Sequence, residues 1–141
     1  AINRGVAEAR GELFFIVDSD DTLPSDSLET ISVYTQGINW RDDGIAGVSG
    51  VKVYTNGERV GGAFPFEELI CNAIELRDKY HVKGDMAEVW VTSILKEYPT
   101  NESFVKAFHE LDEEDIIMSN YDLYTRLLMV KDCITGYRKD K

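Results

Sequence analysis

Apolar runs alternate with helix-like stretches along this chain, an order that is typical of an α/β domain. Residues 12–17 form a continuous apolar run, which predicts a central strand covered on both faces. Residues 1–10 before it have apolar positions on one side of a helix, which Gly11 can end. The polar segment 18–22 and Pro24 then predict a loop.

A helix, a strand and a tight turn are expected next. Ser25 or Asp26 can cap the helix, and Glu29, three residues after Asp26, completes a capping-box pattern. Residues 45–54 are rich in Val, Ile and Gly and predict a strand. The Asn-Gly pair at 56–57 is a strong hairpin signal, so we expect the chain to return antiparallel after it.

The second half of the chain has a weaker pattern. Residues 66–80 have apolar positions near helical spacing, and residues 86–91 form a short apolar segment. A short helix is expected over residues 92–97, before a proline. Residues 114–130 carry an apolar stripe that predicts a long late helix, and residues 135–141 are expected to fray.

Composition restricts the class of protein. A chain of 141 residues with 43% hydrophobic and 11% aromatic residues fits one packed domain. The formal net charge of -11 argues against nucleic acid or an anionic membrane surface as the main partner. Because no apolar run reaches the ~18 residues of a membrane span, no transmembrane segment is expected. Cys71 and Cys133 have no metal-ligand spacing and fit reduced thiols in a cytosolic protein.

The candidate chemistry lies where the apolar strand ends in Asp18, Asp20 and Asp21. Three carboxylates within four residues repel one another, and a nearby cation relieves that cost. Carboxylate oxygens suit Mg²⁺ or Mn²⁺, which in turn bridge phosphates. The carboxyl ends of strands in open α/β sheets are also where ligands bind. The structural alternative is an Asp-rich turn that only caps the helix beginning near Ser25.

The wider segment, residues 1–21, resembles family 2 glycosyltransferases, in which a helix ends in an Ala-(Lys/Arg)-Gly-Glu turn before an apolar strand and a D-x-D-D motif. Here the turn is Arg10-Gly11-Glu12 and the motif is residues 18–21. Residues 75–91 also resemble one bacterial branch of the family. The resemblance implies a partial GT-A fold, a Rossmann-like mixed sheet flanked by helices. Residues 1–141 would form a single domain lacking the family's N-terminal nucleotide-binding strands.

The family transfers a sugar from a nucleotide-sugar donor to an acceptor hydroxyl, with inversion at the anomeric carbon. By this resemblance the donor is a UDP-sugar, and the acceptor a saccharide or lipid-linked saccharide of cell-surface polysaccharide assembly. Asp18 would lie near the ribose and sugar of the donor. Asp20 would bind the Mn²⁺ or Mg²⁺ that neutralises the diphosphate leaving group. Asp21 would support the loop or act only as a cap.

An inverting transfer needs a carboxylate to take the proton of the acceptor hydroxyl. The family places an acidic pair before a late helix, so Asp115 is the first candidate, with Glu114 beside it and Glu102 in competition. These carboxylates also fit a solvated helix N-terminus, where they complement the helix dipole. Asp85 and Trp90 are candidates for acceptor binding, by hydrogen bonding and by stacking on a sugar. Packing is the alternative role of Trp90.

The chain also departs from the family pattern. Ile2 stands where the family has Arg, and the family's first strand and base-reading acidic residue are expected upstream of residue 1. A sheet without its first strands exposes an edge, so we expect self-association. The location implied is the cytoplasm, at the inner face of the membrane. Two alternatives stay open. One is a non-catalytic binding or scaffold module with this fold. The other is a Mg²⁺-dependent phosphotransferase or nucleotidyltransferase, which lacks support because the sequence has no Gly-rich phosphate loop or P-loop.

Overall fold

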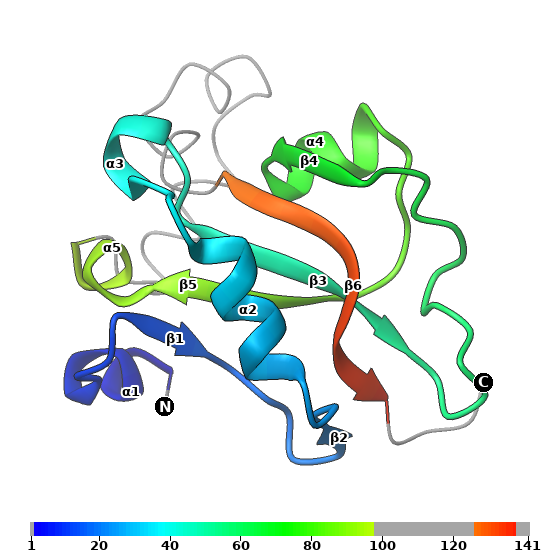
Figure 1. Cartoon of the computed structure of the whole chain (residues 1–141), viewed down its shortest axis with the longest axis horizontal. Coiled ribbons are helices and arrows are strands. Elements are labelled where there is room, and N and C mark those ends of the chain that lie inside the picture. Colours follow the sequence, from blue (N-terminus) through cyan, green and yellow to red (C-terminus); the bar gives the residue numbers. More distant parts are fainter. Residues whose placement is uncertain (1, 98–125, 138–141) are drawn as a thin grey trace.

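The computed structural model describes residues 2–97 and 126–137 of the chain (Figure 1). Within them a curled mixed sheet is flanked by helices, so the predicted α/β class with a mixed sheet is confirmed. The elements in chain order are α1 (Ile2–Glu8), β1 (Leu13–Phe15), β2 (Asp21–Thr22), α2 (Ser27–Thr35), α3 (Trp40–Asp43), β3 (Gly47–Val53), β4 (Glu68–Cys71), α4 (Ala73–Asp78), β5 (Met86–Val91), α5 (Thr92–Glu97) and β6 (Leu127–Tyr137).

The strand order is β1-β5-β3-β6-β2, with β4 also paired to β6. Strand β5 runs antiparallel to both β1 and β3, whereas β3 and β6 are parallel. The long strand β6 pairs antiparallel with β4 along its first half and with β2 at its end. The pairing of β2 attaches the end of the aspartate-rich loop to β6.

Both faces of the sheet carry apolar side chains. On one face, Ile31 of α2 packs against a buried cluster that includes Val48, Val89 and Ile134, and α2 crosses this face in Figure 1. A second buried cluster, which includes Leu76 of α4, gathers side chains from β4, α4, β5 and β6. Burial of these side chains is the main stabilising contribution to the fold.

Several local predictions are confirmed. Helix α1 and strand β3 form as expected, and α5 has the predicted bounds. After the Asn-Gly turn the chain returns to form an isolated antiparallel bridge from Arg59 to Val53, and Gly57 has the positive φ of 87° that the turn requires. Asp26 is the N-cap of α2, but its side chain makes no capping hydrogen bond, so the predicted capping box is wrong.

The apolar run after α1 does not form a central strand. In the described part of the chain, β1 lies at one end of the strand order and pairs with β5. The strand is apolar on both faces for another reason. Leu13 and Phe15 pack on the core. Phe14 faces α1, where a Cβ added to Gly5 would lie 3.5 Å from the Phe14 ring. Helix α1 therefore covers the face of β1 that the core does not.

Two predicted helices are wrong in part because long-range strand pairing overrides the local pattern. Within the expected helix 66–80, residues 68–71 form β4 and only residues 73–78 are helical. Of the expected helix 114–130, residues 127–130 begin β6 and pair with both β3 and β4; its earlier part lies outside the described residues, apart from Arg126. Residues 135–137, expected to fray, end β6 in pairing with β2 and β3.

No helix among the described residues is long and apolar enough to cross a membrane.

Candidate functional site

Three aspartates gather where the loop after β1 leads into β2. One carboxylate oxygen from each of Asp18, Asp20 and Asp21 lies within 4.8 Å of the others. The backbone N–H of Asp21 donates a hydrogen bond to the carbonyl oxygen of Asp18 at 3.0 Å, which closes the loop. We call these three residues the aspartate cluster.

The register of three strands places Lys52 beside this cluster. Thr22 of β2 and Val53 of β3 are both paired with Gly136 of β6, so the three side-chain positions share one face of the sheet. Because side chains alternate along a strand, Asp21 and Lys52, each one residue earlier, share the opposite face. They are two strand spacings apart, roughly 10 Å across the sheet, and their partners Tyr137 and Thr135 are two residues apart along β6, so the long lysine side chain is needed for the two charges to meet.

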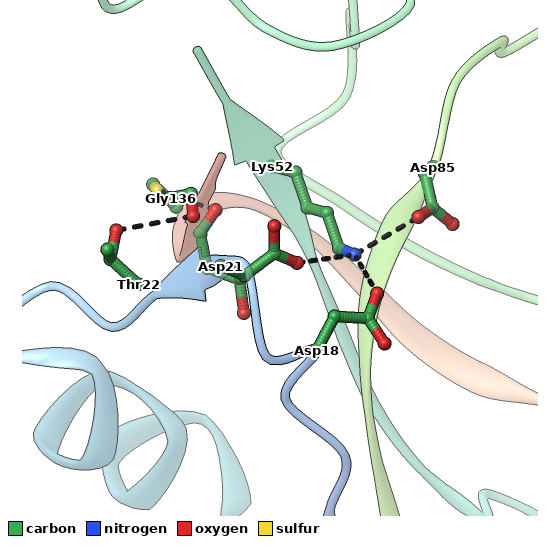
Figure 2. A network of polar contacts seen from close by, with 8 residues as sticks. Asp18, Asp21, Thr22, Lys52, Asp85 and Gly136 are labelled. Atoms are coloured by element: carbon green, nitrogen blue, oxygen red, sulfur yellow. Dashed lines mark hydrogen bonds and ion pairs between the residues drawn. The ribbon is translucent and has the colours of Figure 1, made fainter. Parts of the chain in front are cut away.

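Lys52 forms ion pairs with three carboxylates, two from the aspartate cluster and one from the segment just before β5 (Figure 2). Its Nζ lies 3.0 Å from Asp85 Oδ2, 3.2 Å from Asp21 Oδ2 and 3.8 Å from Asp18 Oδ2. The first two contacts are also hydrogen bonds that the ammonium donates. The loop after β1, strand β3 and the start of β5 therefore meet at this one charge.

Burial differs sharply among these groups. The side chains of Lys52 and Asp21 are 8% and 1% exposed, whereas those of Asp18 and Asp85 are 64% and 57% exposed. Burial is the largest single influence on the pKa of Lys52 and lowers it. Hydrogen bonds and charge from Asp85 and Asp21 together outweigh burial, so the pKa of Lys52 is raised above its ordinary value. Lys52 is therefore a cation at neutral pH.

Asp21 offers an oxygen to a further ligand. Its Oδ2 accepts the hydrogen bond from Lys52, while its Oδ1 is buried and has no hydrogen-bond partner among the described residues. A buried carboxylate oxygen without a partner is costly. Hard divalent cations such as Mg²⁺ and Mn²⁺ take oxygen ligands, so the residues of the aspartate cluster fit such an ion.

The segment that carries Asp85 is held by backbone contacts. Arg59 donates hydrogen bonds from Nη1 to the carbonyl oxygens of Lys83 and Gly62, at 2.8 and 3.0 Å. Gly61 and Gly84 meet backbone to backbone, and a Cβ on Gly61 would lie 2.3 Å from Gly84 Cα. These contacts set where Asp85 meets Lys52.

An open pocket of about 490 Å³ adjoins Asp85. Its lining includes Arg77, His81 and Lys83, so basic side chains gather beside Asp85 in a strongly acidic chain. Glu88 on β5 lies near the same charges. Burial, together with the charge of Asp85, raises the pKa of Glu88, while a hydrogen bond from Trp90 and the charges of Arg77 and Lys52 oppose the rise. Asp85 is thus largely exposed, whereas Glu88 is in a partly buried environment that favours its protonated form.

The structure brings together only some of the predicted site residues. Asp18, Asp20, Asp21 and Asp85 lie around Lys52 or beside it. Trp90 is five residues from Asp85 along β5, a separation of about 16 Å at roughly 3.3 Å per residue. It is partly buried and packs against two core clusters.

The predicted base Asp115, its neighbour Glu114 and the competing Glu102 lie outside the described residues.

Lys52 was missed by the sequence reasoning, although a signal for it exists. It is the single charged residue in β3, whose other side chains are apolar or small. A charge within a strand that is otherwise buried requires a partner, because desolvating it alone is too costly. The pattern thus indicates a partner, but identifying the partner requires the pairing of β3 with β6 and β5.

A scan against protein-family models, a comparison with curated proteins and a comparison with solved structures each find no match.

Proposed function

We propose that this chain is part of a metal-dependent glycosyltransferase of GT-A type, which moves a sugar from a UDP-sugar to a hydroxyl of a saccharide or lipid-linked acceptor. One observation supports this most: the D-x-D-D segment follows an apolar strand, and its three carboxylates converge to within 4.8 Å. The buried Oδ1 of Asp21, which has no partner among the described residues, adds support, because it suits a cation ligand.

Each part of the site has a role in this proposal. Asp20 and Asp21 hold Mn²⁺ or Mg²⁺, and Asp18 lies toward the ribose and sugar of the donor. The metal, when bound, neutralises charge on the diphosphate leaving group. The pocket beside Asp85 is the candidate place for the acceptor, because it is open and Asp85 shares Lys52 with Asp21 of the aspartate cluster. Asp115 or Glu114 takes the proton of the acceptor hydroxyl.

One observation favours the non-catalytic alternative. Lys52 already neutralises part of the charge on Asp18 and Asp21, so the cluster is compensated without a metal. A binding or scaffold module of this fold would retain such an ion pair for stability alone. It would bind no Mn²⁺ through Asp20 and would not consume a donor.

Donor hydrolysis and transfer distinguish the two functions. We would incubate the protein with UDP-sugars and Mn²⁺, measure the UDP released, and compare Asp20→Asn with Asp42→Asn. Asp42→Asn removes the same charge at an exposed position in α3, so it is the matched control. We expect Asp20→Asn to lower the rate at least a hundredfold, the scale on which transition-state charge stabilisation acts, and Asp42→Asn to leave it unchanged. Equal rates for the two variants, or no UDP release from any sugar donor, would contradict the transferase function.

A further inference from the structure

Lys52 occupies a position that a bound metal would have to share. Its Nζ contacts Asp21 and Asp18, which are two of the three residues that can hold a cation. A divalent ion held by the same carboxylates would lie within several ångströms of the ammonium. At that separation two positive charges repel strongly in a partly buried site.

The ammonium is held in place from the other side as well. Asp85 accepts the shortest hydrogen bond of Lys52 Nζ, at 3.0 Å. Asp85 belongs to the segment that is held by Arg59 and by the close approach of Gly61 to Gly84. Lys52 is also 8% exposed and comes from the middle of the sheet, so it has little freedom to swing into solvent. A metal that enters therefore meets a charge that stays nearby.

An anion reverses this balance. A diphosphate bound to such a metal would bring negative charge toward Nζ, so Lys52 would become a favourable neighbour of the complex. The carboxylates alone can attract the bare ion, but Lys52 offsets that attraction. Lys52 would thus favour the ion that carries a diphosphate over the free ion.

We propose that Lys52 is a specificity-determining residue, which makes the aspartate cluster a site for a metal–diphosphate complex and weakens its binding of the free metal ion. This inference rests on the proposed function, since it concerns the same metal and donor. According to this proposal, Lys52 causes the metal ion and the diphosphate each to strengthen the binding of the other. By linkage, the diphosphate strengthens metal binding by the same factor as the metal strengthens diphosphate binding.

The test is a titration of the full chain with Mn²⁺, with and without UDP, corrected for the Mn²⁺–UDP complex that forms in solution. For the chain without UDP, we expect Lys52→Gln to bind Mn²⁺ at least tenfold more tightly than the wild type. In the wild type, we expect UDP to tighten Mn²⁺ binding at least tenfold, and in Lys52→Gln by a much smaller factor. Lys131→Gln is the matched control: it removes one charge from an exposed pair with Glu67 and should change neither affinity.

The outcomes separate the inference from the function on which it rests. Equal Mn²⁺ affinity in the wild type and Lys52→Gln, both abolished by Asp20→Asn, would overturn the role of Lys52 and leave the metal site intact. Coupling between UDP and Mn²⁺ that depends on Lys52, without release of UDP from any sugar donor, would support the inference and contradict the transferase. If Lys52→Gln does not fold, the wild type decides: a Mn²⁺ affinity that UDP leaves unchanged overturns the inference.

Discussion

The close approach of Gly61 to Gly84 allows a sharp test of how the Asp85 segment is held. Gly61 has a φ of 87°, and a Cβ there would lie 2.3 Å from both Gly84 Cα and the carbonyl oxygen of Lys83. The neighbouring Gly62 has a similar φ of 95°, yet an added Cβ would meet no atom within 4 Å. Alanine at the two positions therefore imposes the same kind of backbone strain, with a steric clash at Gly61 alone.

The expected magnitudes follow from these two terms. The left-handed conformation costs an alanine about 1–2 kcal/mol, which should be the whole effect of Gly62→Ala on the free energy of unfolding. Gly61→Ala adds a backbone clash of the overpacking type, worth about 1–3 kcal/mol more. We expect Gly61→Ala to lower the free energy of unfolding by about 2–5 kcal/mol in total.

Urea denaturation followed by tryptophan fluorescence measures the free energy of unfolding of both variants, provided that the slope m is the same as in the wild type. The informative quantity is the difference between the two variants, because the strain common to both cancels. Equal losses for Gly61→Ala and Gly62→Ala would show that the two backbone segments do not meet as described. The origin of the fixed position of Asp85 would then need another explanation.

Two further predictions use side-chain ionisation. Burial raises the pKa of the Cys71 thiol to about 11, so iodoacetamide at pH 8 should label Cys71 slowly in the folded chain and rapidly in urea; mass spectrometry giving equal rates would contradict its burial. A hydrogen bond to Asp132, aided by burial and nearby carboxylates, raises the pKa of Tyr34 to about 12 from its ordinary value of 10.0. Because the folded state holds this proton more tightly, the contribution of Tyr34 to stability is present below pH ~10 and is lost as the pH rises from there toward ~12. Tyr34→Phe should remove a tyrosinate step near pH 12 in an absorbance titration and flatten that loss, and an unchanged titration would refute the assignment.

Local patterns predicted the elements whose formation depends on nearby residues. The Asn-Gly turn needs only a positive φ at Gly57, and α5 needs only six helix-compatible residues before a proline. Strand β3 was predicted from its apolar and β-branched composition. The aspartate cluster was also visible, because an apolar strand running into three carboxylates is itself a local pattern.

Pairing between distant segments decided the rest. Residues 68–71 and 127–130 are helix-like by spacing, but each supplies the backbone partners that the other requires, and both become strand. The position of β1 at the end of the strand order also depends on which strands pair, and a run of apolar residues alone does not determine this.

The candidate site shows the same division. The sequence by itself determined that Asp18, Asp20 and Asp21 lie together, because four consecutive positions contain all three. Only the tertiary structure decided that Lys52 and Asp85 join them. Lys52 is 31 positions from Asp21 along the chain, and Asp85 is 33 positions from Lys52. The physical reason is that strand register aligns these side chains on one face of the sheet, and the register is set by the packing of the whole core.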